Sequence, residues 1–292
     1  MSIRSELLLS FKKGNSLTKL IYINLIVFLL VSICHIICRL MLFDDSQLLS
    51  YIAMPANPIE FLHKPWTLIS YMFVHQGFIH ILFNVLNLYW FGKLFLTYFN
   101  QKQLVGLYLL GGIFGGLVYL LTFNLFPYFQ PVVNKSILFG ASASALAVMT
   151  GVAAYNPNME IGLMLIGRVK IKYIAIVFFF LSLFSVVGQN AGGNLAHLGG
   201  IAIGYLFALR MKKGKDLTKG LNHLIDFFVD LFTRKPKMKV SQGKRPISDF
   251  DWNANKAWEN KTIDDILDKI KKSGYDSLTA EEKKMLFDQS KK

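Results

Sequence analysis

The chain contains 292 residues, of which 32 are Lys or Arg and 18 are Asp or Glu, so its formal net charge is +14. Hydrophobic residues make up 53% of the sequence and charged residues only 17%, and the mean hydropathy is +0.40. Soluble domains carry about 25% charged residues, so this composition excludes a single soluble domain. The abundance of apolar side chains also excludes a disordered chain.

The charge is distributed unevenly. Residues 1–210 hold 13 Lys or Arg and 5 Asp or Glu, whereas residues 211–292 hold 19 and 13. The first part is therefore an apolar body and the second a water-soluble appendage. Basic segments beside apolar runs are more typical of contact with anionic lipid headgroups than of nucleic-acid binding. We expect membrane lipids as partners and no nucleic acid.

Six apolar runs are candidates for membrane spans, since a hydrocarbon core of roughly 30 Å takes about 20 helical residues. They cover residues 20–43, 78–98, 104–125, 141–155, 173–187 and 191–210. The fourth and fifth are short, so their flanking residues would have to extend them. The first run is too long for a signal-peptide core and is expected to stay as an anchor.

The basic residues between these runs predict the orientation of the chain. With the N-terminus inside, most basic residues fall in inner segments, namely Arg4, Lys12, Lys13, Lys19, Lys93, Lys102, Arg168, Lys170, Lys172, Arg210, Lys212, Lys213 and Lys215. The outer segments hold only Arg39, Lys64 and Lys135, together with most of the acids. Both termini are therefore predicted to lie in the cytoplasm.

Four segments follow from this pattern: a cytoplasmic N-terminal segment (1–19), a six-helix membrane domain (20–210), an amphipathic helix with a basic linker (211–245), and a two-helix module (246–292). Residues 44–76 form a Pro- and aromatic-rich outer loop suited to the membrane interface. The apolar residues between 221 and 232 repeat at helical spacing and predict a helix on the inner membrane surface, or equally one packed on the tail.

The tail itself shows a helix at 262–272, a break at Ser273-Gly274, and a second helix opened by a capping box at 279–282. We assign no catalysis to it.

Polar residues inside spans are costly and are therefore candidates for function. The second run contains His80 and Asn84, whose spacing of four places an imidazole and an amide on one helix face. Taken alone, this pair could equally serve hydrogen bonding between helices.

The fourth run opens with Gly-Ala-Ser-Ala-Ser at 140–144. Close helix packing explains many such runs of small residues. The chemical possibility is a hydroxyl at a helix N-terminus, where unpaired backbone N–H groups can stabilise an oxyanion.

The sixth run opens with a glycine-rich stretch, 192–200, that contains His197 and is followed by Gly204. A neutral imidazole there could accept the proton of a serine hydroxyl, which is a poor nucleophile without such a base. Counted from an inner N-terminus, the second, fourth and sixth runs all start outside. His80, Ser142 and His197 are therefore predicted to share the outer half of the bilayer.

In order and spacing these residues resemble the rhomboid family of intramembrane serine proteases, over about residues 65–210. The matching motifs are His80-x-x-x-Asn84, Gly140-x-Ser142 and Ala196-His197-x-x-Gly200-x-x-x-Gly204. The resemblance implies an all-α fold, a six-transmembrane-helix bundle, here with a small helical C-terminal tail that is similar to modules following some bacterial rhomboids. A bacterial cytoplasmic membrane is the compartment that it suggests.

The resemblance also implies roles for the residues. Ser142 would be the nucleophile and His197 the general base of a dyad without a carboxylate. His80 and Asn84, with the Ser142 backbone N–H, would line the oxyanion hole. We expect Gly140, Gly200 and Gly204 to allow close helix packing near this site.

The sequence departs from the family pattern at several points. Ala143 follows the serine where members often have Gly, and Leu146 stands where some carry an aromatic ring stacked on the histidine. Ser144 offers a second hydroxyl, but a helix turns it about 200° away, so we favour Ser142. The first outer loop lacks the Trp-Arg pair of many relatives.

Three alternatives were weighed. An inactive rhomboid-like protein that binds transmembrane partners would be expected to lose the serine or the histidine, and both are present. A transporter or channel would favour paired charges or repeated halves. A metal site at His75, His80 and His197 would lack carboxylate or thiolate partners.

We therefore predict a serine endopeptidase that cleaves transmembrane helices near the outer face and needs no metal or other cofactor. The oligomeric state is left open.

Overall fold

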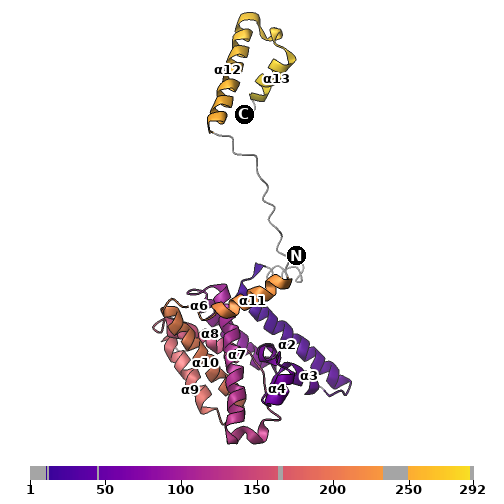
Figure 1. Ribbon diagram of the computed structural model, residues 1–292, viewed down its shortest axis with the longest axis vertical. Helices are drawn as coiled ribbons and strands as arrows, with labels where there is room; N and C mark the ends of the chain where they lie inside the picture. The colour runs from indigo at the N-terminus through magenta and orange to yellow at the C-terminus, as the bar shows by residue number, and fades with distance from the viewer. Residues whose placement is uncertain (1–10, 12, 45, 164–166, 233–248, 290–292) are drawn as a thin grey trace. The chain divides into compact units, whose positions relative to one another are not determined.

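The computed structural model describes residues 11, 13–44, 46–163, 167–232 and 249–289. The chain divides into two compact units, Met1–Thr233 and Arg234–Lys292, and each is described by itself. The first unit is the bundle of apolar helices seen in Figure 1.

Six apolar helices build the first unit, as predicted. They are α2 (Ser16–Leu40), α6 (Phe78–Phe95), α7 (Gln101–Leu125), α8 (Ser142–Tyr155), α9 (Ile171–Phe184) and α10 (Ala191–Lys212). By length and composition α2, α6, α7 and α10 can each cross a membrane, whereas α8 and α9 are shorter apolar helices. The predicted all-α membrane bundle is thus confirmed.

Helix α2 starts earlier than the apolar run that predicted it. The side chain of Asn15 accepts a hydrogen bond from the Thr18 backbone N–H at 3.0 Å, which caps the helix. Similarly, Asn100 and Gln103 form a reciprocal capping box that fixes the start of α7. Polar capping residues therefore extend these helices beyond the apolar residues by which they were recognised.

Close packing of α7, α8 and α10 forms the centre of the bundle. A Cβ atom on Gly200 would overlap the carbonyl oxygen of Ala143, and one on Gly204 would overlap that of Ala147. On the side of α7, a Cβ on Gly115 would lie only 2.7 Å from the Ala196 carbonyl oxygen. These glycines let the three backbones touch, which is how helices associate where lipid offers no hydrophobic driving force.

Shorter elements connect the helices. The segment between α2 and α6, which the sequence predicts to be the outer loop, contains α3 (Ser46–Ile52), β1 (Met54–Pro55), α4 (Pro58–His63), α5 (Thr67–Ser70) and the 3₁₀ helix η1 (Tyr71–Phe73). After α7 come η2 (Pro127–Val132) and β2 (Ile137–Leu138), and β2 pairs antiparallel with β1. The β1–β2 pair therefore joins the outer loop to the segment that leads into α8.

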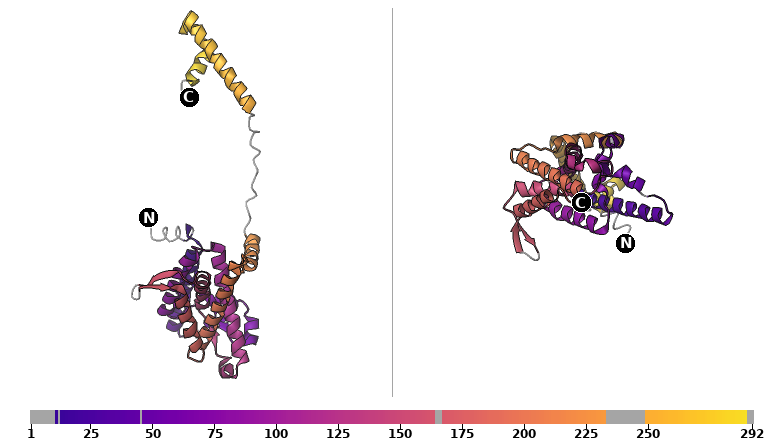
Figure 2. Two further views of the ribbon diagram at one scale, coloured as in Figure 1. Left: turned by 90° about the vertical axis from the view of Figure 1, so that its left-hand side faces the viewer. Right: turned by 90° about the horizontal axis from the view of Figure 1, so that it is seen from below.

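A second pair of strands, β3 (Glu160–Leu163) and β4 (Gly167–Lys170), forms an antiparallel hairpin between α8 and α9. It projects from the bundle in both views of Figure 2. Neither strand pair was predicted, because segments of two to four residues are too short to show an alternating pattern.

The predicted amphipathic helix is α11 (Lys219–Phe232), and its polar side faces α7. Lys102 on α7 forms an ion pair with Asp226 at 2.7 Å. Gly106 lies against Thr218 and Asn222, so the helix packs beside the first two turns of α7. Its large apolar side chains point outward, and Leu224, Phe227, Phe228 and Leu231 are each more than half exposed.

The second unit contains α12 (Asp249–Ser273), η3 (Tyr275–Ser277) and α13 (Ala280–Gln289). The start of α12 lies 13 residues before the predicted 262, because the polar segment 249–261 lacks Pro and Gly and continues the helix. Thr279 and Glu282 form the predicted capping box, and Lys269 pairs with Glu282 at 2.9 Å. The basic linker, 234–245, lies outside the described residues.

Candidate active site

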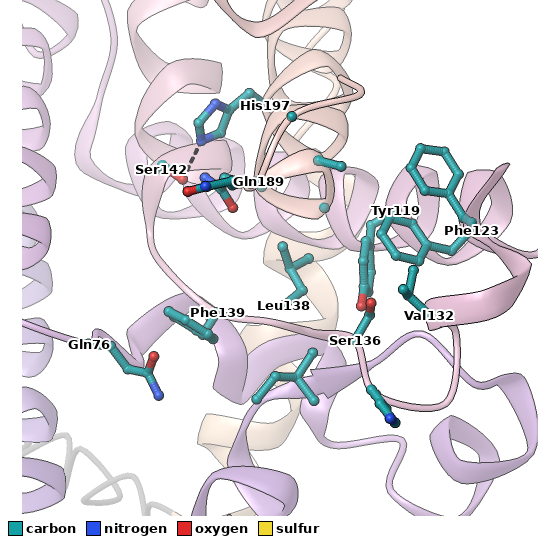
Figure 3. Close-up of a pocket in the computed structure, with 18 of the residues that line it drawn as sticks. Gln76, Tyr119, Phe123, Val132, Ser136, Leu138, Phe139, Ser142, Gln189 and His197 are labelled. Carbon is teal, nitrogen blue, oxygen red and sulfur yellow. Dashed lines mark hydrogen bonds between the residues drawn. The ribbon is translucent and has the colours of Figure 1, made fainter. Parts of the chain in front are cut away.

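Ser142 and His197 meet where helix α8 begins. The Oγ atom of Ser142, the first residue of α8, lies 2.7 Å from Nε2 of His197 on α10, within hydrogen-bond distance (Figure 3). Both side chains are partly buried. A hydroxyl and an imidazole separated by 55 positions in the sequence are therefore placed as nucleophile and base would be.

The close approach of α8 and α10 produces this contact. Gly200 follows His197 by one helical turn and touches the backbone of Ala143, the residue after the serine. A larger side chain at Gly200 would separate the helices and with them the hydroxyl and the imidazole. The glycine pattern of the sixth span thus determines the distance between the two polar groups.

The turn before Ser142 has a conformation that requires glycine. Gly140 has φ +123°, and a Cβ there would lie 3.0 Å from Nε2 of His80 and 3.8 Å from Oγ of Ser142. The Gly140 N–H donates to the Tyr71 carbonyl at 2.9 Å. Gly140 therefore leaves room between the His80 ring and the serine, in addition to allowing helix packing.

The pair on α6 borders the same space. Asn84 is buried, and its amide donates one N–H to the carbonyl of His80 at 2.9 Å. An amide nitrogen carries two N–H donors, so the second is left for a ligand in the cavity. In the described part of the chain, α8 also begins without a side-chain cap, at residue Ser142 itself.

A cavity of 990 Å³ contains these groups. Its wall includes His80, Asn84, Ser142 and His197, and polar residues at its edge include Gln76 and Gln189, both exposed. Aromatic residues, among them Tyr119, Phe123 and Phe139, line another part of the wall (Figure 3). The site can therefore hold a peptide segment with apolar side chains while water reaches it from the exposed polar edge.

The departures from the family pattern have structural counterparts. The Ala143 side chain faces Gly115 of α7, so its methyl group serves helix packing. Leu146 is buried in the core cluster. Ser144 is fully buried, and its Oγ has no hydrogen-bond partner among the described residues, whereas Ser142 contacts the imidazole. Geometry thus favours Ser142 over Ser144 as the reactive hydroxyl.

The metal hypothesis finds no support in the part of the chain that the structure describes, where no group of three His, Cys, Asp or Glu could hold an ion. His75 contacts the backbone through both of its ring nitrogens: Nδ1 lies 3.2 Å from the Phe73 carbonyl, and Nε2 accepts the Ala141 N–H at 3.3 Å. Its observed role is to support the turn that precedes Ser142.

Two residues near the dyad were missed by reasoning from the sequence. His75 had been considered only as a metal ligand, and Ser182 on α9 had not been noticed. The Oγ atom of Ser182 lies 3.3 Å from Nδ1 of His197. The available signal was a serine in a largely apolar span, but serines in spans usually bond their own helix backbone, so it was not specific.

No curated protein matches the chain. Residues 249–292 match a family of unknown function, DUF6576. Residues 62–213, just over half of the chain, match the rhomboid domain, and this range contains all four polar site residues. The chain therefore belongs to the rhomboid family.

Proposed function

We propose that this protein is an intramembrane serine endopeptidase with a Ser142–His197 dyad, and that its substrates are transmembrane proteins. The observation that carries the proposal is the 2.7 Å distance between Ser142 Oγ and His197 Nε2 at the wall of a cavity. Membership of the rhomboid family supports the same reaction class.

In the acylation step, Ser142 Oγ attacks the scissile carbonyl carbon while His197 Nε2 accepts the hydroxyl proton. A C–O bond forms, and the carbonyl oxygen becomes an oxyanion. When this intermediate collapses, the C–N bond breaks and the imidazolium gives its proton to the departing amine. The products of this step are an acyl-enzyme and a new amino terminus.

The developing oxyanion needs donors, and three groups can supply them: His80, the second amide N–H of Asn84, and the backbone N–H of Ser142. The first two border the cavity that contains Ser142. The third stands at the N-terminus of α8, where the helix dipole also favours negative charge.

Hydrolysis of the acyl-enzyme then requires water, which His197 deprotonates for attack on the ester. Gln76, Gln189 and Asn190 give the cavity an exposed polar edge for its entry. A substrate helix must unwind to place an amide at Ser142, because a helical amide is shielded by side chains and by its neighbouring turns. We therefore propose that cleavage occurs where a transmembrane helix ends at the outer face.

For the orientation, we propose that both termini lie in the cytoplasm of a bacterial cell, as the basic residues of the inner segments indicate. Helix α11 supports lipid contact on that side. Its polar face contacts α7 through the Lys102–Asp226 ion pair, while Phe228 and Leu231 are exposed. A nitroxide at position 228 should be relaxed more strongly by dissolved oxygen than by a water-soluble nickel complex; the reverse would contradict this placement.

The activity can be tested by reconstituting the protein in vesicles, treating it with a fluorophosphonate probe and locating the adduct by peptide mass. We expect an adduct on Ser142 that is lost in Ser142→Ala and His197→Ala. Cleavage of a transmembrane reporter should be lost in the same variants. An adduct on Ser144 would move the site, and no adduct beside a positive reference protease would favour an inactive, partner-binding member.

A further inference from the structure

The second ring nitrogen of His197 has a partner on another helix. Ser182 belongs to α9, of whose 14 residues only Ile171 and Ser182 are buried. Ser182 is 3% exposed and its Oγ lies 3.3 Å from His197 Nδ1. The buried hydroxyl of α9 is therefore that of Ser182, and it faces the His197 ring that contacts Ser142.

The direction of this hydrogen bond follows from counting protons. The Ser182 hydroxyl has one proton, which it donates to the Phe178 carbonyl at 2.8 Å. With its proton directed to this carbonyl, the oxygen accepts from the imidazole, and Nδ1 then carries the proton. A neutral imidazole has one N–H, and Nε2 is therefore the bare nitrogen that accepts from Ser142 at 2.7 Å.

We propose that Ser182 is a positioning residue, which holds His197 in the tautomer with Nδ1 protonated and Nε2 free to act as a base. This inference rests on the proposed function for its catalytic consequence, although the tautomer itself does not. Among the described residues the hydrogen-bond contact of Nδ1 is Ser182 and not a carboxylate, and Leu146 provides no aromatic ring to orient the imidazole. A serine on α9 supplies both the orientation and the choice of tautomer.

The same bond ties α9 to the centre of the bundle. Most of the α9 surface is exposed, with Val177, Leu181 and Phe184 each more than half exposed. Side-chain contacts join this helix and the turn after it to α10: Ser182 with His197, and the amide of Asn194 with the Ser185 carbonyl at 2.9 Å. The position of α9 therefore determines whether Nδ1 keeps its acceptor.

The tautomer can be measured directly by ¹⁵N NMR of the full-length protein with labelled histidine, in detergent micelles near neutral pH. The signals of His197 are assigned by their loss in His197→Gln. We expect a protonated Nδ1 and an unprotonated Nε2 in the wild type, and a shift toward protonated Nε2 in Ser182→Ala. Ser182→Thr, which keeps the hydroxyl, should retain the wild-type pattern.

Activity provides the second measurement. With the transmembrane reporter, Ser182→Ala should lower kcat on the order of 10-fold with KM nearly unchanged, because one hydrogen bond to the base is lost and no substrate contact. Ser182→Thr should restore most of this rate. Ser144→Ala, which removes another buried hydroxyl of the bundle, is the matched control and should leave kcat unchanged. Thermal unfolding verifies that each variant is folded.

The outcomes separate the two proposals. An unchanged tautomer in folded Ser182→Ala, or a protonated Nε2 in the wild type, would overturn the role of Ser182 whatever the activity. If the wild type shows the expected tautomer and Ser182→Ala shifts it, but no protein cleaves the reporter or reacts with the fluorophosphonate, the positioning contact stands and the proposed function fails.

Discussion

Helices α8 and α9 have the same length, 14 residues, and both are apolar, but they occupy opposite environments. Eleven residues of α8 are buried, whereas α9 buries only two. Their composition explains the difference: α8 consists mainly of Ala, Ser, Gly and other small residues, whereas α9 is rich in Phe, Leu and Ile. Figure 1 shows α9 at one edge of the first unit.

This difference in burial between α8 and α9 explains how the site is assembled. Small residues bring the backbones of α7, α8 and α10 into contact. This contact places Ser142 Oγ within hydrogen-bond distance of His197 Nε2. The large residues of α9 face outward, and the helix contributes one buried hydroxyl, that of Ser182. The dyad is therefore set by central packing, while its orientation depends on a single contact from the rim.

The strongest disruption of this arrangement should come from Gly200→Val. The new side chain would overlap the Ala143 carbonyl, a backbone atom that cannot move without displacing α8. We expect a loss of at least about 3 kcal/mol in the free energy of unfolding, or failure to fold. The measurement is denaturant unfolding in micelles.

Phe180→Ala on the exposed side of α9 is the matched control for that prediction. Phe180 is 45% exposed in the described structure, so its truncation should change the unfolding free energy by no more than about 0.5 kcal/mol. If Gly200→Val and Phe180→Ala lowered the unfolding free energy equally, the buried centre and the exposed helix α9 would contribute equally to stability, which would contradict this prediction.

The next largest effect concerns the donors on α6. His80→Ala and Asn84→Ala should each reduce kcat by roughly 10- to 1000-fold if each group stabilises the oxyanion. Their KM values should change little, because the interaction develops in the transition state. Unchanged kcat in both variants would leave these residues as supports of the cavity wall.

The sequence was sufficient to identify the polar residues of the site, but not the contacts that bring them together. Intramembrane polar residues are rare, so His80, Asn84, Ser142 and His197 stood out, and topology placed three of them in one half of the bilayer. The distance between Ser142 and His197 could not be predicted, because it depends on contacts such as Gly200 with Ala143. The β1–β2 pair, which joins two loops far apart in sequence, also left no local signal.

Contacts of Ser182 and His75 were equally invisible from the sequence. A serine on an apolar helix bonds its own backbone in most cases, and only the tertiary structure shows that Ser182 also reaches His197. Likewise, His75 was conspicuous as a titratable group, but its backbone partners, Phe73 and Ala141, are determined by the fold of the outer loop.

Helix α11 extends the comparison, since polar contacts hold it to the bundle in addition to the packing of Gly106 against Thr218 and Asn222. Asp216, at the turn before it, accepts hydrogen bonds from the Gln103 amide at 3.0 Å and the Thr218 N–H at 2.8 Å. Burial alone would raise the pKa of Asp216, but these hydrogen bonds and nearby Lys219 outweigh it and hold the pKa below its usual value. The attachment of α11 should therefore depend on pH.

Because the pKa of Asp216 is lower in the folded protein than in the unfolded chain, its ionised carboxylate stabilises the attachment of α11 at pH values above the unfolded pKa of about 3.9. This contribution is lost as the pH falls through the pKa of the folded protein. A nitroxide at position 224, with Cys34 and Cys38 replaced by Ser, should become more mobile as the pH falls below about 4. Asp216→Asn should reduce this change. Mobility that is independent of pH in the parent protein would show that apolar packing holds α11.

A small effect of opposite sign is expected at Ser144, in the buried helix α8. Its Oγ is buried without a hydrogen-bond partner among the described residues, so the hydroxyl is desolvated and gains nothing in return. Ser144→Ala should therefore leave cleavage unchanged and raise the unfolding free energy by up to about 1 kcal/mol. A clear loss of stability or activity would mean that the Ser144 hydroxyl has a hydrogen-bond partner. The centre of the bundle would then supply a second polar group to the site in addition to positioning Ser142.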